Sequence, residues 1–303
     1  GFNFTTKNVV SNPILDANNW TGPGILGRDP GVGLTVTGGI PANGFVDIGS
    51  MDSNRTDMIW GTYRASLKLT PIVGTCAAFF WYFNDSQEID LEFLSEQFIP
   101  DNNTYPVNLV IQNEKTVQSG YVKGPDNFQV VNLPFNPATA YHEYRIDYVP
   151  GHIVFYGDGK VIHAFPGPTT PYEPGHLILT HWSNGNPTWS AGPPVSKATM
   201  SVGYVKGYFN SSSSGRRSSW AARCKDPSAT SAICAIPDQV APPDPAIVIG
   251  NSTAANGYFF SSDTNKTVNQ TVYRKSSAPT TGSSPYGMSI ALLGAITFLT
   301  VFL

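Results

Sequence analysis

The chain has 303 residues and a formal net charge of -3, with 41% hydrophobic and only 13% charged residues. This charged fraction is about half of the usual one-quarter, and 29 glycines with 25 prolines favour a turn-rich, secreted β protein. The slightly acidic balance argues against nucleic acid as a partner, because that role needs a basic surface. The length suits one large β domain with terminal extensions.

Short apolar runs separated by Gly, Pro and Asn turns dominate the first 210 residues, without a long stretch of helical period. The clearest element is the hairpin from Ile153 to Phe165, whose Gly157-Asp158-Gly159 turn supplies the positive φ that tight turns require. Further strands are expected at 64–69, 77–83, 107–112, 176–181 and 199–208. We therefore expect an all-β fold in which two antiparallel sheets cover each other's apolar faces.

The most distinctive element is the run SQEIDLEFL from Ser86 to Leu94. Side chains alternate along a strand, so Glu88, Asp90 and Glu92 point to one face and three apolar side chains point to the other. Neighbouring carboxylates repel one another and lose solvation on burial, and catalysis is the commonest reason for such a cluster. A solvated acidic edge strand is the alternative, because strict alternation is also typical of any half-exposed strand.

Retaining cleavage of a glycosidic bond needs such a set of acids. One carboxylate acts as nucleophile and one carboxylic acid protonates the leaving oxygen, with the two groups about 5 to 5.5 Å apart. On an ideal strand the Cα atoms of Glu88 and Glu92 are about 13 Å apart, so both side chains must lean inward. Asp90 lies between them and can hydrogen-bond to either. Crowding then separates their acidities, so that one group keeps its proton near neutral pH while another stays ionised.

The segment from Glu88 to Leu94 resembles the active-site signature of glycoside hydrolase family 16, in the form without an extra bulge residue. That form occurs in plant xyloglucan endotransglycosylase/hydrolases and in fungal chitin-glucan crosslinking transglycosylases. Segments at 61–65, 74–82, 141–148, 153–162 and 181–185, followed by Trp189, agree with the family in the same order. The resemblance implies a jelly-roll β-sandwich of the concanavalin A-like type, with a concave catalytic face.

The resemblance also implies roles for the three acids. Glu88 would be the nucleophile, Glu92 the general acid/base, and Asp90 the residue that orients or tunes them. Gln87 departs from the Asp that related transglycosylases usually carry before the signature, which leaves the choice of substrate and acceptor open.

By weaker analogy, the resemblance implies that Asn108, Trp182 and Trp189 line the sugar subsites. The polar segment 184–187 between the two tryptophans predicts an exposed loop, which favours sugar-stacking positions for them. Ordinary packing is the alternative, because large aromatic side chains carry much of the buried area of a sandwich.

These observations predict a retaining glycosidase that cleaves a β-linked cell-wall polysaccharide, first of all a β-1,3- or mixed-linkage glucan. A chitin-glucan crosslinking transglycosylase and a non-catalytic, lectin-like wall glycoprotein are the alternatives. The expected partner is the polysaccharide, with chitin or xyloglucan also considered, and the protein is expected to be a monomer. No Cys or His spacing predicts a metal site and no phosphate-binding glycine loop occurs, so we expect neither a catalytic metal nor a cofactor.

Several features predict passage through the secretory pathway. The chain starts at Gly1 without a leader, as expected after removal of a signal peptide. Cys224 and Cys234 enclose a short polar loop and form the expected disulfide, whereas Cys76 is expected as a buried thiol. The candidate N-glycosylation sites are Asn3, Asn19, Asn54, Asn84, Asn102, Asn210, Asn251, Asn265 and Asn269.

The expected domains are a catalytic domain over residues 1–215, a cysteine-containing extension over 216–240, a glycosylated stalk over 241–287 and an apolar end over 288–303. The stalk is rich in Ser, Thr, Asn and Pro and cannot bury enough apolar surface to fold. The apolar end is short for a membrane span and matches the removable tail of a glycosylphosphatidylinositol signal. Ser276 or Ser277 is the expected attachment site, with Gly282 or Ser283 as alternatives. A plain C-terminal membrane anchor is the alternative. We therefore expect a secreted or cell-surface wall protein held by a lipid anchor.

Overall fold

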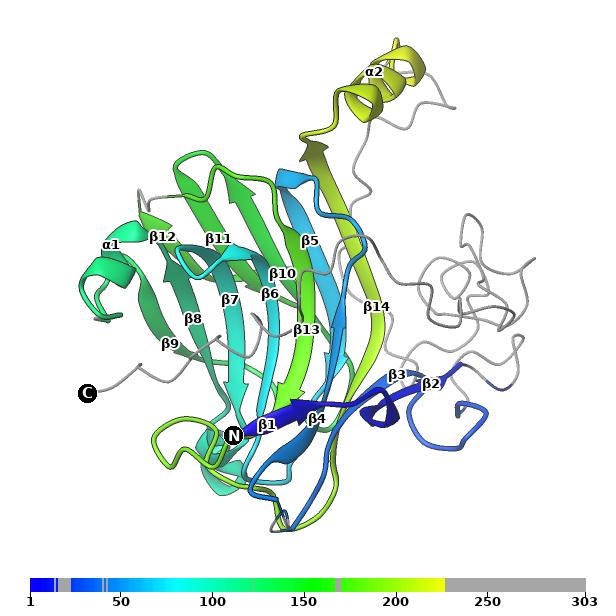
Figure 1. The fold of residues 1–303 in the computed structure, drawn as a ribbon, viewed down its shortest axis with the longest axis vertical. Helices are drawn as coiled ribbons and strands as arrows, with labels where there is room; N and C mark the ends of the chain where they lie inside the picture. Colours follow the sequence, from blue (N-terminus) through cyan, green and yellow to red (C-terminus); the bar gives the residue numbers. More distant parts are fainter. Residues whose placement is uncertain are drawn as a thin grey trace.

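The computed structural model describes residues 1–13, 15, 23–39, 41, 43–121, 123–166 and 170–226. Within these residues two seven-stranded sheets pack face to face (Figure 1). This architecture confirms the predicted all-β, two-sheet sandwich.

The first sheet has the strand order β1-β4-β13-β6-β7-β8-β9. All neighbouring strands in it are antiparallel, except that β1 runs parallel to β4. Its strands are β1 (Phe2–Phe4), β4 (Val46–Asp52), β13 (His176–Trp182), β6 (Cys76–Asn84), β7 (Gln87–Leu94), β8 (Pro106–Gln112) and β9 (Phe128–Asn132). The acidic run forms β7, which is hydrogen-bonded on both edges, so the alternative of an edge strand is wrong.

The second sheet has the order β12-β11-β10-β5-β14-β3-β2, and its neighbouring strands are antiparallel. Its strands are β12 (Lys160–Pro166), β11 (His152–Gly157), β10 (His142–Val149), β5 (Met58–Lys68), β14 (Ala198–Ser211), β3 (Gly31–Val36) and β2 (Val9–Asn12). The predicted hairpin is confirmed as β11 and β12. Asp158 and Gly159 in its turn have φ of 48° and 73°, the left-handed values that the Gly-rich turn indicated.

The core lies between the two sheets, and the apolar half of β7 is part of it. Ile89, Leu91 and Phe93 are at most 1% exposed and belong to the main hydrophobic cluster. Phe93 meets Tyr144 of the second sheet edge to face, with ring centroids 4.7 Å apart. Full burial of one such side chain stabilises the fold by about 1.5 to 3 kcal/mol, so this face of β7 fixes the strand against the second sheet.

In the part of the chain that the structure describes, helical structure is limited to short segments. They are α1 (Glu114–Gln118), α2 (Ser214–Arg223) and the 3-10 turns Thr6–Asn8, Ser95–Gln97 and Pro100–Asn102. Helix α2 follows β14 and projects from the end of the sandwich (Figure 1). No helix was predicted there, because the sequence of α2 is strongly polar, and its large apolar side chain, Trp220, is 50% exposed in the structure. A helix without an apolar stripe leaves no hydrophobic period to detect.

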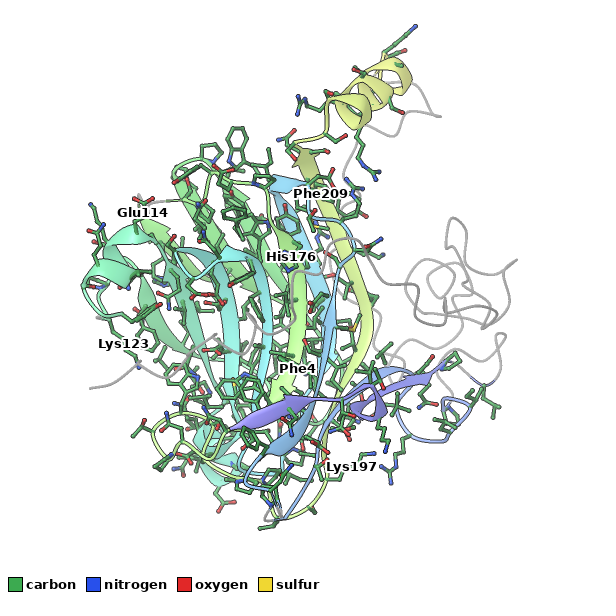
Figure 2. The ribbon with its side chains drawn as sticks, in the orientation of Figure 1. Phe4, Glu114, Lys123, His176, Lys197 and Phe209 are labelled. Carbon is green, nitrogen blue, oxygen red and sulfur yellow. The ribbon has the colours of Figure 1, made fainter. Side chains whose placement is uncertain are left out.

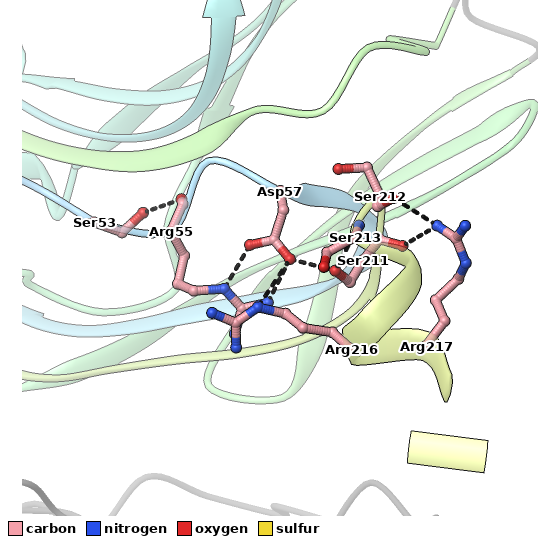
Figure 3. A network of polar contacts seen from close by, with 8 residues as sticks. All are labelled: Ser53, Arg55, Asp57, Ser211, Ser212, Ser213, Arg216 and Arg217. Atoms are coloured by element: carbon pink, nitrogen blue, oxygen red, sulfur yellow. Dashed lines mark hydrogen bonds and ion pairs between the residues drawn. The ribbon is translucent and has the colours of Figure 1, made fainter. Parts of the chain in front are cut away.

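A cluster around Asp57 joins the start of β5 to the end of β14 and to α2 (Figure 3). Arg55 donates to the two Asp57 oxygens at 2.5 and 2.7 Å, and the Ser211 hydroxyl donates to the same carboxylate. Arg216 from α2 approaches Asp57 to 3.6 Å, and Arg217 donates to the Ser211 carbonyl at 2.8 Å. The hydrogen bonds from Arg55 hold the pKa of Asp57 well below its usual range, so this carboxylate is ionised at neutral pH.

Some predictions fall outside the described residues. These are Asn19, Cys234, Asn251, Asn265, Asn269, Ser276, the stalk over 241–287 and the apolar end over 288–303. Cys76 is a free, buried cysteine, whereas Cys224 at the end of α2 is not a free thiol. Among the described residues, no helix is both long and apolar enough to cross a membrane.

Candidate active site

The structure brings the three predicted acids together on the outer face of the first sheet. In the strand register, Glu88 faces Tyr82 of β6, and Glu92 faces Ala78 of β6 and Asn108 of β8. The three side chains are only 2 to 5% exposed, although their face points away from the main core. The alternation of β7 therefore separates a packing face from an acidic face, as the sequence predicted.

Glu88 and Asp90 hydrogen-bond to each other through their side chains. Glu88 Oε1 is buried and accepts no hydrogen bond from a donor of the described residues. A buried polar atom without a partner is unfavourable, and such atoms often mark the place where a ligand or reacting group sits. The free lone pairs of Oε1 are the kind that a nucleophile needs.

Glu92 is held by neutral donors from other elements. The Cys76 thiol on β6 lies 3.6 Å from Glu92 Oε1, and the side chain of Trp189 also hydrogen-bonds to this carboxyl group. Asn108 Nδ2 donates to the Glu92 carbonyl at 3.4 Å and to Gln97 Oε1 at 3.0 Å. Together these contacts fix both the backbone and the carboxyl group of Glu92.

The electrostatic environment keeps protons on the acidic face. Burial raises the pKa of all three carboxyls, and the negative charges of Glu88 and Glu92 push the pKa of Asp90 further up, well above its usual range. Burial raises the pKa of Glu88 to about 8, although the hydrogen bond that a protonated Asp90 donates to Glu88 opposes this rise. Burial raises the pKa of Glu92 to about 7, against the lowering effects of Cys76, Trp189 and Lys123. A carboxylic acid with this pKa can give its proton to a leaving group near neutral pH.

A cavity of about 30 Å³ lies next to Asp90 and Glu92. Its lining also includes Tyr121, Lys123, Phe128, Asn186 and Trp189. A buried water molecule needs a cavity volume of at least about 10 to 15 Å³, so this cavity has room for one or two water molecules.

The predicted subsite residues have different positions. Asn108 is buried beside Glu92, and Trp189 lines the cavity. Trp182 is 4% exposed, belongs to a second hydrophobic cluster and packs against Phe2 with ring centroids 5.9 Å apart. Core packing accounts for that position of Trp182, and its contact with a sugar stays a prediction.

Two residues near the site, Lys123 and Cys76, were not predicted from the sequence to belong to it. The Lys123 ammonium lies 4.3 Å from the ring centroid of Phe128 and 4.6 Å from that of Trp189. Cys76, expected only as a buried thiol, contacts Glu92. Both contacts form between segments that are distant in the sequence. They could be predicted only if the strand pairing and the loop geometry were already known.

Gln87 has a structural role at the start of β7. Its Oε1 accepts hydrogen bonds from the backbone N–H groups of Tyr172 and Glu173, at 2.9 and 3.0 Å. The Tyr172 hydroxyl in turn donates to Glu114 Oε1 at 3.1 Å. A neutral amide at position 87 thus anchors the segment before β13 next to Glu88 without adding a fourth carboxylate to the cluster.

The described residues contain no group of three or more His, Cys, Asp and Glu side chains that could hold a metal ion. Because the acidic face is built from carboxyl groups with raised pKa values, its arrangement suits proton transfer and nucleophilic attack.

Residues 29–205 match the protein-family model for glycosyl hydrolases family 16, which covers more than half of the chain. The chain belongs to this family. The "Beta-glucanase" of Paenibacillus polymyxa is 30% identical to this family 16 chain over 155 residues, which are 49% of this chain and 58% of that protein. The "Probable xyloglucan endotransglucosylase/hydrolase protein 21" of Arabidopsis thaliana is 32% identical over 125 residues, 39% of this chain and 36% of that protein.

Among solved structures, the β-glucanase of Bacillus licheniformis is similar to this family 16 chain with a TM-score of 0.52 and 24% identity. The alignment covers 69% of this chain and 85% of that structure, and it supports the sandwich fold. In sequence, the chain spans 58% of the length of the β-glucanases of P. polymyxa and B. licheniformis.

Proposed function

We propose that this protein is a retaining glycosidase that cleaves a β-linked glucan through a covalent intermediate on Glu88. The observation that carries the proposal is the acidic face of β7 in a family 16 domain. There Glu88 Oε1 accepts no hydrogen bond from a donor of the described residues, while burial raises the pKa of Glu92 to about 7. The glucan is proposed because several of the relatives are named β-glucanases.

In the proposed reaction, a Glu88 oxygen attacks the anomeric carbon while Glu92 gives its proton to the departing glycosidic oxygen. Asp90 donates a hydrogen bond to Glu88 and so limits the negative charge of the cluster before attack. In the second step Glu92, now ionised, takes a proton from water as the water attacks the same carbon and releases Glu88. The configuration at the anomeric carbon is inverted twice and is therefore retained.

The test compares wild type with Glu88→Gln on β-1,3-glucan, mixed-linkage glucan, xyloglucan and chitin oligomers, with products analysed by mass spectrometry. We expect the substitution to reduce cleavage by about 10³-fold or more, because the amide cannot form the intermediate. Glu96→Gln, an exposed carboxyl-to-amide change just after β7, is the matched control and should cleave like wild type. Wild-type activity in Glu88→Gln would exclude the mechanism, and glucan binding without turnover by wild type would favour a lectin.

Transfer to a sugar hydroxyl is the second candidate, supported by similarity to a probable endotransglucosylase/hydrolase of Arabidopsis thaliana. A fluorescent oligosaccharide acceptor separates the two reactions. Label that enters the polymer indicates transfer, whereas release of reducing ends alone indicates hydrolysis. Linkage preference, with β-1,3- and mixed-linkage glucans as the first choices, follows from the same products.

A location on the secretory route is part of the proposal. The candidate glycosylation sites within the described residues are all exposed: Asn3, Asn54, Asn84, Asn102 and Asn210. An attached glycan needs such a surface position, so their exposure supports the proposal. A protein from its native source whose mass does not change on enzymatic removal of N-glycans would contradict it.

A further inference from the structure

Lys123 covers an aromatic ring at the edge of the acidic face. It lies between α1 and β9 at the edge of the first sheet (Figure 2). Its ammonium group is 4.6 Å from the ring centroid of Trp189 and 4.3 Å from that of Phe128. Because all three side chains line the cavity that Glu92 also lines, the ring face of Trp189 next to the acid is occupied by a cation.

Under the proposed function, on which this inference rests, the neighbourhood of Glu92 is where the leaving group departs and the acceptor arrives. The acid that protonates the leaving oxygen in the first step is the base that activates the acceptor in the second. Glu92 lines the same cavity as Trp189 and Lys123, so an acceptor or leaving sugar that reaches Glu92 through this cavity passes both side chains.

The lining of this space affects two acceptors differently. The cavity of about 30 Å³ beside Glu92 has room for a water molecule next to the acid. A sugar acceptor would gain from stacking on an exposed aromatic face, as apolar ring surfaces do when they leave water. In this structure the Lys123 ammonium already lies over that face of Trp189.

We propose that Lys123 is a specificity residue that favours water over a sugar as acceptor of the glycosyl intermediate. An acceptor O–H attacks the anomeric carbon, the bond from that carbon to Glu88 breaks, its electron pair stays on the Glu88 carboxylate, and the acceptor proton goes to Glu92. Water reaches this position with Lys123 in place. A sugar hydroxyl reaches it only after the sugar has displaced the ammonium from Trp189.

The backbone turn before Lys123 defines its position, but a ligand can easily displace its side chain. Gly120 and Tyr121, just before it, have φ of 71° and 64°, so the chain makes a tight left-handed turn at this point. The Lys123 side chain is exposed, and cation–π contacts at exposed sites are weak enough for a ligand to replace. Attraction between Lys123 and Glu92 adds to the contacts with the rings and holds the ammonium near the acid.

The test measures the ratio of transfer product to new reducing ends for the full chain, with a β-glucan donor and a fluorescent glucan oligosaccharide as acceptor. Lys123→Ala uncovers Trp189 and should raise this ratio about two- to thirty-fold, the range that corresponds to loss of one or two exposed cation–π contacts. Lys123→Arg keeps a cation that stacks on aromatic rings and should keep the wild-type ratio. Lys115→Ala removes an exposed lysine of α1 and is the matched control.

Lys123→Met retains an apolar stem without the charge and should also raise the ratio, which covers the case that the alanine variant is poorly folded. If the lysine variants cleave glucan but share one ratio, or if the arginine variant behaves like the alanine variant, the inference is wrong and the proposed function stands. If wild type releases no fragments from any glucan, the proposed function fails, and the inference fails with it.

Discussion

Carboxylates occupy two opposite environments in this protein. At the junction of β5, β14 and α2, Asp57 accepts two hydrogen bonds from Arg55 and lies near Arg216, so its pKa is well below the usual range. On β7, carboxyls lie next to other carboxyls in a buried setting, and their pKa values are raised. The same chemical group therefore stabilises the region around Asp57 as an anion, whereas on β7 it can gain or lose a proton near neutral pH.

The two regions therefore make opposite contributions to stability as the pH changes. Asp57 has a lowered pKa in the folded state, so its stabilising contribution is present above the unfolded Asp value and is lost as the pH falls through the folded one. The β7 carboxyls have raised pKa values, so their contribution is present below the unfolded values and is lost as the pH rises through the folded ones. Near neutral pH the junction stabilises the fold while the acidic face destabilises it.

Of the three changes that test this comparison, the largest effect is expected from replacing the acidic group of Glu92. Glu92→Gln should lower turnover of a glucan by about 10² to 10⁴-fold, the usual contribution of a general acid. Aryl glycosides with activated leaving groups need little protonation and should lose much less in the first step. Steady-state kinetics on both substrates provide the measurement, and an equal loss on the two would show that Glu92 is not the acid.

An intermediate effect is expected from the same type of change at the junction. Asp57→Asn should lower the free energy of unfolding at pH 7 by about 1 to 3 kcal/mol, because Arg55 and Ser211 lose their charged partner. The difference from wild type should shrink as the pH falls below the usual Asp range. Urea denaturation at several pH values measures this, and glucan cleavage should stay at the wild-type level. Equal stability of wild type and Asp57→Asn at pH 7 would contradict the stabilising role of the ionised Asp57.

The smallest effect, of opposite sign, is expected for Asp90→Asn. The folded wild type must keep a proton on Asp90 at pH values where the unfolded chain releases it, and asparagine avoids this while still donating to Glu88. The substitution should therefore stabilise the fold by on the order of 1 kcal/mol near pH 8 and have little effect near pH 4. Thermal unfolding across this range is the measurement. If the stability of wild type and of Asp90→Asn changes with pH in the same way, the β7 carboxyls do not differ from Asp57 as described above.

The fold was predictable where local patterns determine it. Alternation along the segment from Ser86 to Leu94 predicted a strand with an apolar and an acidic face, and the turn at Asp158 predicted the hairpin of β11 and β12. Strand order depends on pairings between distant segments and came only from the family resemblance. The parallel pairing of β1 with β4 and the polar helix α2 carry no periodic signal, and neither was predicted.

For the site, the sequence identified the acids and some of their surroundings. Spacing along one strand was enough to place Glu88 and Glu92 on a common face, because two-residue alternation is a local property. Lys123 and Cys76 reach Glu92 from other segments, and no local pattern encodes such a contact. Trp182 is the opposite case. Its place next to a polar loop favoured a sugar contact in the sequence, but the sequence does not show that Phe2 packs against its ring.

All eight residues of β7 are buried, so the strand presents no position where a side chain simply faces water. Random substitution is normally tolerated best at solvated positions, and here each change disturbs either the interior packing or the reacting groups. Under the proposed function, new preferences among glucans therefore have little scope to arise within the strand itself. They should accumulate instead in the bordering loops, where Lys123 and Trp189 lie, and relatives that differ in product should differ there first.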